Sequence, residues 1–289
     1  MRVLVTGATG YVGGGILRAL LGAGHEVVGI VRDETTPLPK GVRPRRGDLT
    51  DDASLAAAVD GVDGVIHAAA SPDDVDGRID LAATRTFLDA LAGTGRFFVL
   101  TSGTWVVGET GDTPATEEAP FDPPRAIAWR PRAERLVQEA AARGVRSSVV
   151  RAATVFGRGG GYLSTLLAVQ DGVVRHFADG ENRWSVVHVD DLGELYRLAA
   201  ERAPAGSVYN GVAGVVRVRD VAQAAAEAAG ARVEAWPADE AEKAWGAWVE
   251  AFSIDHVVSG DRARRELGWS PSRPRLIDEL RAVATYAAA

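Results

Sequence analysis

The chain of 289 residues contains no cysteine, which excludes disulfide bonds, thiolate metal sites and a cysteine nucleophile. Lysine is almost as rare, with only Lys40 and Lys243 among 32 lysines and arginines. Tyrosine is found at five positions: Tyr11, Tyr162, Tyr196, Tyr209 and Tyr286. Any mechanism that needs a tyrosine or a lysine must use one of these seven side chains.

Acidic residues outnumber basic ones, and long apolar runs are missing. The formal net charge is −7, which argues against a nucleic-acid or an anionic membrane partner. No run approaches the roughly 20 apolar residues of a membrane span, and the apolar start turns at once into glycine-rich sequence rather than a secretory signal. The five histidines are dispersed, so we expect no metal site. These features predict a cytoplasmic monomer or homodimer that acts on a small-molecule substrate.

The first half of the chain alternates short β-branched runs with longer stretches rich in alanine and leucine. Strands are predicted over residues 2–6, 26–31, 62–67, 96–101 and 145–151, and helices over 12–21, 54–59, 79–91 and 131–142. Continuous apolar strands separated by helices indicate a parallel sheet covered on both faces. The predicted fold class is therefore α/β, with a Rossmann-like doubly wound parallel sheet.

The pattern loosens after residue 155. Helices are predicted over 162–170, 190–201, 218–229 and near 239–251, 261–266 and 275–287, and strands over 185–189, 208–210 and 232–235. We interpret residues 1–155 as a dinucleotide-binding domain. Residues 156–289 are mainly a small C-terminal α/β substrate-binding portion, interleaved with the sheet in one structural unit. Ligands bind at the carboxyl edge of such sheets, so this portion is expected to form the substrate walls.

A glycine-rich motif directly follows the first predicted strand and opens the first predicted helix. Glycines at these positions permit a tight turn and let backbone N–H groups approach a pyrophosphate, which the positive helix N-terminus attracts. The alternative is an ordinary strand-to-helix turn, but the strand before the motif and the helix after it favour a dinucleotide site. The predicted cofactor contacts are Gly7, Thr9, Gly10, Tyr11, Val12 and Gly13.

The second predicted strand ends at Arg32. An acidic residue here usually binds the ribose 2′-hydroxyl, whereas an arginine accommodates a 2′-phosphate. Arg32 therefore favours NADP(H) over NAD(H). Two observations leave the choice open: Asp33 comes next and could reach a ribose, and Arg32 could simply be solvated.

Further motifs extend across nearly the whole chain, at residues 5–13, 47–51, 65–70, 150–157, 187–192 and 266–271. Together they resemble the extended or atypical short-chain dehydrogenase/reductases, the NAD-dependent epimerase/dehydratase family. The resemblance implies an adenine-contacting turn at Asp48 and Leu49 and a ribose-contacting stretch at Ala68 and Ala69. It further implies cofactor contacts at Thr101, Arg130 and Val155.

The family typically uses a Tyr-x-x-x-Lys pair, in which the tyrosine moves a proton and the lysine lowers its pKa and holds the ribose. The resemblance implies a glutamate four residues after the lysine, and Glu134 is the natural candidate. This alignment puts Arg130 at the lysine position and Ala126 at the tyrosine position. No tyrosine or lysine lies between residues 41 and 161, so we infer that the pair is absent.

The family's third catalytic group, a serine or threonine, is also displaced. The resemblance of residues 101–108 to the family's serine-rich segment puts that hydroxyl at Gly103, which is flanked by Ser102 and Thr104. Arginine cannot act as a general acid at neutral pH, so another group must move the proton. The predicted catalytic residues are Arg130, Thr104, Ser102 and Tyr162.

Three functions fit this inventory. The favoured one is an NAD(P)-dependent oxidoreductase with non-standard catalytic residues, acting on a small hydrophobic carbonyl, alcohol or imine. The others are a non-redox isomerase, cyclase or dehydratase that keeps the nucleotide site, and a non-catalytic NADP-binding sensor. Tryptophans that are not in the core would form the substrate walls. The predicted substrate contacts are Trp105, Trp129, Tyr162, Arg183 and Trp184.

Overall fold

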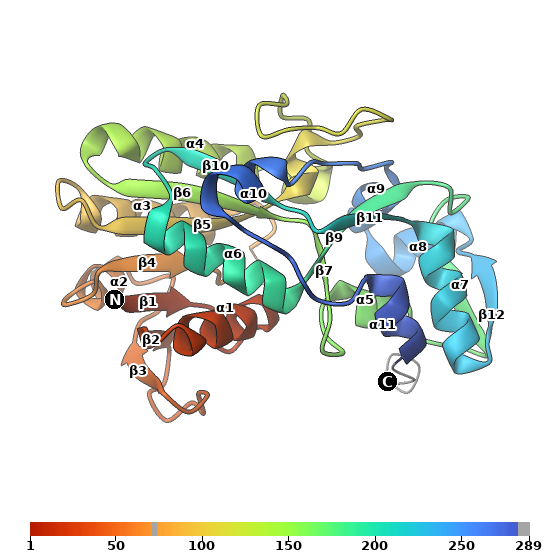
Figure 1. The fold of residues 1–289 in the computed structure, drawn as a ribbon, viewed down its shortest axis with the longest axis horizontal. Coiled ribbons are helices and arrows are strands. Elements are labelled where there is room, and N and C mark those ends of the chain that lie inside the picture. The colour runs from red at the N-terminus through yellow and green to blue at the C-terminus, as the bar shows by residue number, and fades with distance from the viewer. Residues whose placement is uncertain (71–73, 283–289) are drawn as a thin grey trace.

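A seven-stranded parallel sheet forms the centre of the protein, in a computed structural model that describes residues 1–70 and 74–282 (Figure 1). Its strand order is β10-β6-β5-β4-β1-β2-β3. This order confirms the predicted Rossmann-like α/β fold. The strands are β1 (Arg2–Thr6), β2 (Glu26–Val31), β3 (Val42–Arg46), β4 (Gly64–His67), β5 (Phe97–Gly103), β6 (Arg146–Ala152) and β10 (Ser207–Gly211).

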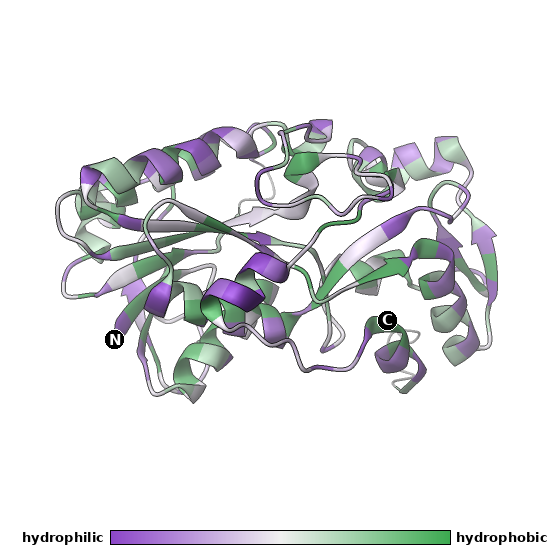
Figure 2. Ribbon diagram, turned by 45° about the horizontal axis from the view of Figure 1, so that its top comes forward, coloured by the Kyte–Doolittle hydropathy of each residue, from purple (hydrophilic) through white to green (hydrophobic). Residues whose placement is uncertain are grey.

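Helices cover both faces of this sheet. One face carries α1 (Tyr11–Gly22) and α6 (Val189–Arg202), and the other carries α2 (Asp52–Ala58), α3 (Arg78–Leu91) and α4 (Arg130–Ala140). Successive side chains of a strand point to opposite faces. Accordingly Val3 and Val5 pack into the core under α1 and α6, whereas Leu4 packs into the core under α2–α4. Figure 2 shows the hydrophobic residues concentrated along the central strands.

Two glycines let α1 and α6 approach each other closely. A Cβ atom at Gly15 would lie 2.4 Å from the Val189 carbonyl oxygen, and one at Gly193 would lie 2.3 Å from the Gly15 carbonyl oxygen. The helices are therefore in backbone contact, and this contact joins the first helix to one from the second half of the chain. The same half also supplies β10, which pairs with β6.

A smaller lobe lies beyond the carboxyl edge of the sheet, on the right of Figure 1. It contains a three-stranded sheet of order β11-β9-β7 and the parallel pair β12-β8. Its strands are β7 (Thr154–Phe156), β8 (Val173–His176), β9 (Arg183–His188), β11 (Gly214–Arg217) and β12 (Arg232–Ala235). Its helices are α5 (Tyr162–Leu166), α7 (Val218–Ala229), α8 (Ala238–Trp245), α9 (Trp248–Ser253) and α11 (Leu276–Ala282), while α10 (Asp261–Leu267) lies against β10 and α6.

The lobe differs from the sequence prediction in two of its helices and contains three strands that were not predicted, β7, β8 and β11. The helix predicted from residue 162 ends at Leu166. The single helix predicted over 239–251 is two helices, because Gly246 has a φ of +53° and ends α8. Of the helix predicted over 275–287, α11 covers the described part, and residues 283–289, including Tyr286, lie outside the described residues. None of the helices in the described ranges is long and apolar enough to cross a membrane.

A buried ion pair ties α4 to the sheet. The Arg151 Nε donates to both carboxylate oxygens of Glu134 at 3.1 Å, and its Nη2 donates to Oε2 at 2.8 Å. The Ser102 hydroxyl donates to Glu134 Oε1 at 2.6 Å. Both charged side chains are almost fully buried. Removal of one partner from such a pair leaves an uncompensated charge in the core, which is strongly destabilising.

We therefore expect Arg151→Ala to lower the free energy of unfolding by about 3–5 kcal/mol, because it leaves the Glu134 carboxylate buried without its cation. Equilibrium unfolding in urea measures this change. Arg143→Ala is the matched control, because Arg143 pairs with Asp89 at 2.7 Å on the surface, and its stability should stay close to that of the unmodified protein. Equal losses in the two variants would contradict the assignment.

Candidate cofactor cleft and active site

The turn between β1 and α1 has the geometry of a phosphate-binding turn. Gly7 has a φ of +69°, and the Gly10 N–H donates to the Gly7 carbonyl oxygen at 2.9 Å. A Cβ atom at Gly13 would lie 1.9 Å from that same oxygen, so no larger residue fits there. The turn is thus tight enough to present the N-terminus of α1 to an anion. Thr9 and Gly10 are exposed, and Val12 is half-buried.

The turn after β4 lies directly against this glycine turn. A Cβ atom at Gly7 would lie 2.6 Å from the Ala68 carbonyl oxygen. The Thr6 hydroxyl oxygen accepts from the N–H groups of Ala68 at 3.1 Å and Ala69 at 3.0 Å. These contacts bring the predicted pyrophosphate and ribose contacts together in one cleft.

Two buried residues that the sequence prediction did not include, Thr6 and His67, support the backbone of this cleft. Because Thr6 Oγ1 accepts two N–H groups, its own proton goes to the His67 Nδ1, 2.7 Å away. In this arrangement the His67 Nδ1 is unprotonated and accepts the hydrogen bond. Burial lowers the pKa of His67 below its ordinary value, which favours the neutral ring. The signal in the sequence was a histidine at the end of an apolar strand, next to the alanines of the ribose stretch.

A loop from the second half of the chain closes against the start of α1. The Tyr11 hydroxyl donates to the Gly157 carbonyl oxygen at 2.7 Å. Cβ atoms at Gly160 and Gly161 would lie 2.6 and 2.7 Å from the Tyr11 ring. The loop that follows β7, the strand containing Val155, therefore packs on the ring of Tyr11, the first residue of α1.

Two arginines meet at the carboxyl ends of β2 and β3. Arg32 follows β2, and Arg46 is the last residue of β3, in register with Val31. Neither guanidinium has a hydrogen-bond or ion-pair partner among residues 1–70 and 74–282. Asp33 is engaged by the backbone N–H of Thr35 at 2.9 Å, and this hydrogen bond lowers the pKa of its carboxyl group.

The predicted adenine turn follows β3. The Asp48 carboxylate accepts from the Thr50 N–H at 2.9 Å and from its hydroxyl at 2.7 Å. These hydrogen bonds lower the pKa of Asp48, and the charge of Arg32 adds to the effect. Leu49 is half-buried and packs on the core under α2 and α3. Asp48 thus lies within electrostatic range of Arg32.

Arg130 is the first residue of α4 and lies at the end of β5. Its Nη1 donates to the Thr101 carbonyl oxygen at 3.1 Å, and its guanidinium stacks on the Trp129 ring at 4.6 Å. Burial raises the pKa of Tyr162, and the positive charge of Arg130 partly opposes this rise. The same is true of Tyr196, whose hydroxyl donates to Thr101 Oγ1 at 2.8 Å. The charge of Arg130 therefore acts on two tyrosines from the second half of the chain.

Four aromatic rings, which we call the aromatic wall, border this region: Trp105, Tyr162, Trp248 and Phe252. The Tyr162 ring lies 5.4 Å from Trp248 and 6.0 Å from Phe252, and Trp105 lies 6.0 Å from Trp248. Tyr162 is 50% exposed. Phe252 is fully buried and supports the rings of Tyr162 and Trp248 from the core side.

The short helix η2 (Arg125–Ile127) contains Ala126, which aligns with the family's tyrosine, and packs against α9. The Arg125 N–H donates to the Glu250 carboxylate at 3.1 Å and fixes α9 beside η2. The α9 end of the aromatic wall therefore lies beside the segment in which we predict the family's tyrosine position. Ala126, the residue predicted to stand there, is half-buried and packs against the core.

Three of the predicted site residues have structural partners instead. Ser102 is 3% exposed and donates to Glu134, because it faces α4 rather than the cleft. Trp184 is 2% exposed, and its Nε1 donates to the Phe252 carbonyl oxygen at 3.0 Å. Arg183 forms hydrogen bonds with the carboxylates of Asp255 and Asp112, each at 2.9 Å. Ser102 and Trp184 are thus buried, whereas Arg183 is paired but partly exposed.

The two remaining predicted contacts are packed against neighbours. Trp129 is half-buried beside Gly77, where a Cβ atom would lie 2.1 Å from its ring. Thr104 is 2% exposed, and its hydroxyl has no hydrogen-bond partner in the described ranges. The contact that links Trp129 to the candidate site is its stacking on the Arg130 guanidinium.

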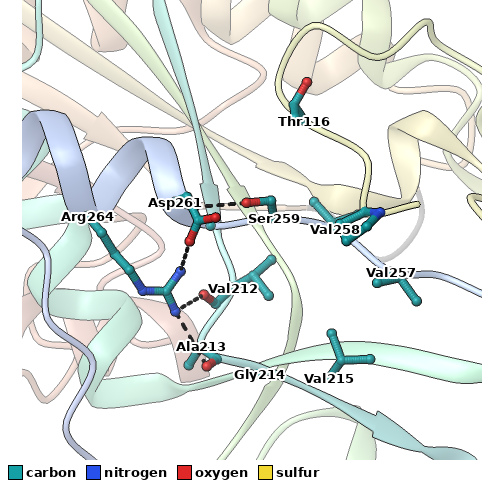
Figure 3. Close-up of a pocket in the computed structure, with 12 residues that line it drawn as sticks. Thr116, Val212, Ala213, Gly214, Val215, Val257, Val258, Ser259, Asp261 and Arg264 are labelled. Atoms are coloured by element: carbon teal, nitrogen blue, oxygen red, sulfur yellow. Dashed lines mark hydrogen bonds and ion pairs between the residues drawn. The ribbon is translucent and has the colours of Figure 1, made fainter. Parts of the chain in front are cut away.

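A pocket of about 460 Å³ lies elsewhere, between β11 and the segment before α10 (Figure 3). Its walls include Val212, Val215 and Val258. Its charged group Arg264 is already paired, at 3.3 Å from Asp261 and 3.0 Å from the Val212 carbonyl oxygen. The described residues that line it include none of those predicted to bind cofactor or substrate. The candidate site is therefore the edge around Gly7, Thr101 and Arg130.

The chain belongs to the NAD dependent epimerase/dehydratase family, whose model matches residues 3–211. An uncharacterized protein of Saccharomyces cerevisiae is 32% identical over 296 residues, which cover 98% of each chain. A protein of Stigmatella aurantiaca, named 4-hydroxy-2-methyl-3-oxo-4-farnesyl-3,4-dihydroquinoline-1-oxide ketoreductase, is 29% identical and covers 93% of this chain and 92% of its own. Among solved structures, MoeE5 in complex with UDP-glucose and NAD is similar, with a TM-score of 0.80 and 26% identity over 99% of this chain and 98% of its own. These findings point to an enzyme of reductase or epimerase/dehydratase type.

The glycine turn generates a direct test of the cofactor cleft. Gly13→Ala should weaken NADP(H) binding at least about tenfold, because its Cβ atom would displace the Gly7 carbonyl oxygen and with it the phosphate-binding turn. Fluorescence titration with NADPH measures the Kd. Gly14→Ala is the control, because its Cβ atom would meet only the flexible end of Arg18 at 3.3 Å. Unchanged affinity in Gly13→Ala would refute the placement of the phosphates.

Proposed function

We propose that the protein is an NADP(H)-dependent oxidoreductase that reduces a small hydrophobic carbonyl or imine compound, or oxidises the corresponding alcohol or amine. One observation carries the proposal. Arg130, at the position expected for the family's lysine, bonds to the end of β5, and its positive charge acts on Tyr162, a half-exposed tyrosine of the aromatic wall. These two side chains supply a fixed cation and a protonated acid.

The cleft fits a dinucleotide. Cβ atoms at Gly7 and Gly13 would fill space that the tight turn needs, and the N-terminus of α1 provides the positive end of a helix for a pyrophosphate. Ala68, Ala69 and Thr101 border the same edge. A bound NADPH would supply the hydride that the carbonyl carbon accepts.

Tyr162 is the proton donor in this mechanism. A tyrosine hydroxyl is protonated at neutral pH, and the rise of the Tyr162 pKa by burial leaves it so, which lets it donate to the carbonyl oxygen as that oxygen gains charge. Arg130 stabilises both the charged oxygen and the tyrosinate that remains. Because Tyr162 is 50% exposed, water can return the proton to it. The acid thus comes from α5 instead of from the position of Ala126.

The preference for NADP(H) rests on Arg32 and Arg46. Both are exposed cations at the carboxyl ends of neighbouring strands, and both lack a protein partner in the described part of the chain. A 2′-phosphate placed there would gain charge-assisted hydrogen bonds. Asp33 is already engaged by the Thr35 N–H, which makes it a weaker candidate for a ribose hydroxyl.

The hydrophobic character of the substrate rests on the aromatic wall. Trp105, Trp248 and the exposed face of Tyr162 form an apolar border next to the proton donor. The ketoreductase of Stigmatella aurantiaca is named for a farnesylated ring ketone, a substrate of comparable apolar character. This relative supports a reductase that acts on an apolar ketone.

Two substitutions test the mechanism. Tyr162→Phe should lower kcat for reduction by about 10²–10⁴-fold, because it removes the general acid. Arg130→Ala should lower it by at least about 10²-fold, because it removes the charge that stabilises the oxyanion. NADPH oxidation with a panel of apolar ketones and imines measures turnover.

Arg132→Ala is the control for Arg130, because Arg132 is exposed on the same helix. Full turnover in Arg130→Ala would overturn the mechanism. Tight NADPH binding without turnover on any carbonyl or imine would instead favour non-redox chemistry or a sensor.

A second test addresses the cofactor. Arg32→Ala should lower the preference for NADPH over NADH by about tenfold, since a charge-assisted hydrogen bond contributes about 1.5–3 kcal/mol. Arg46→Ala should act in the same direction. The ratio of the two Kd values measures the preference, with Arg43→Ala as the control because Arg43 already pairs with Glu26 at 2.8 Å. An unchanged ratio in both arginine variants would sink the NADP assignment.

A further inference from the structure

The three hydroxyl residues at the end of β5 differ in the direction they face. Ser102 faces α4, where its hydroxyl donates to Glu134 at 2.6 Å. Thr101 faces the opposite side, where α6 brings Tyr196 against it. Since side chains alternate along a strand, Gly103 shares the side of Thr101. A Cβ atom at Gly103 would meet nothing closer than the Ala152 carbonyl oxygen at 3.7 Å, so this side has room beyond Thr101.

The bond between Tyr196 and Thr101 fixes where the Thr101 proton points. Tyr196 is fully buried, burial raises its pKa, and Thr101 is its one hydrogen-bond partner in the described part of the chain. The Tyr196 proton therefore goes to Thr101 Oγ1. With one lone pair of Oγ1 occupied from inside the core, the Thr101 proton is left to donate outward.

Arg130 presents further donors at the same place. One of its five N–H groups donates to the Thr101 carbonyl oxygen at 3.1 Å, and its charge reaches both Tyr196 and Tyr162. Thr101 is half-buried near the carboxyl end of β5, so the residue is not sealed in the core as Tyr196 is. A hydroxyl donor and a cation thus converge on one position, as in sites that stabilise a developing oxyanion.

We propose that Thr101 supplies the hydroxyl that binds the reacting oxygen of the substrate, in place of the group missing at Gly103, and that Tyr196 is its positioning residue. This proposal rests on the proposed reductase function. Tyr196 transfers no proton during turnover, because it is sealed in the core. It holds Thr101 Oγ1 as an acceptor from within, so that the Thr101 proton faces the substrate.

Tyr196→Phe removes this single hydroxyl and keeps the ring. We expect kcat to fall about tenfold, with the Kd for NADPH unchanged. Thr101→Val should lower kcat by about 10²-fold, as expected for loss of an oxyanion donor, whereas Thr101→Ser should restore most of the activity. Tyr209→Phe is the matched control, because Tyr209 is also fully buried and its hydroxyl donates to Glu266 at 3.0 Å, on the far edge strand β10.

A Tyr196→Phe enzyme as active as Tyr209→Phe would overturn the positioning role. Weaker NADPH binding with kcat retained in Thr101→Val would also overturn the proposal, because Thr101 would then hold the cofactor instead of the substrate. If Tyr196→Phe does not fold, the contrast between Thr101→Ser and Thr101→Val still decides the role of the hydroxyl. These failures differ from failure of the proposed function, in which the unmodified protein binds NADPH and turns over no carbonyl or imine.

Discussion

The geometry of the site depends on the buried ion pair between Glu134 and Arg151. Glu134 lies one helical turn after Arg130 on α4, so the bond that fixes Glu134 against β6 also fixes the start of the helix at the end of β5. The same carboxylate accepts the Ser102 hydroxyl and thereby sets which side of β5 each residue faces. Because successive side chains of a strand point to opposite faces, Thr101 faces α6 when Ser102 faces α4. One ion pair thus determines the position of the cation and the direction of the hydroxyl.

The fold was largely predictable because its determinants are local. The central strands are continuous apolar runs, and the predicted bounds of β1 and β2 coincide with the observed ones. The strand β3 was missed because its sequence, Val-Arg-Pro-Arg-Arg, carries no apolar pattern. It pairs with β2 alone, and an edge strand tolerates both the proline and the exposed arginines. Only the pairing with β2, which the sequence does not display, makes it a strand.

The predicted cofactor turn and the proposed reaction centre also differ in how far the sequence could predict them. The glycine turn is contiguous, so its residues could be named from the sequence. The reaction centre depends on contacts between distant residues, such as Tyr196 and Thr101, which lie 95 positions apart. Spacing along the chain does not show which face of β5 is buried against α4, and so Ser102 ranked with Thr104 as a catalytic candidate. Trp184 was named for a related reason, because the sequence of a strand does not show whether a tryptophan faces the core, as Trp184 does, or a ligand.

Because lysine and tyrosine are scarce, the proposed mechanism depends on the loop at residues 157–161, which leads into Tyr162. In the proposed mechanism, with Arg130 and Ala126 at the positions expected for the family's lysine and tyrosine, the acid comes from another element. Tyr162 is the first residue of α5, directly after this loop. The loop is itself held by Tyr11, whose hydroxyl bonds to Gly157 and whose ring packs on Gly160 and Gly161. Tyr11 also opens the helix that faces the cofactor phosphates. The glycine turn and the proposed proton donor are therefore linked by one contact, so a displacement of this loop would move Tyr162 and disturb the start of α1 together.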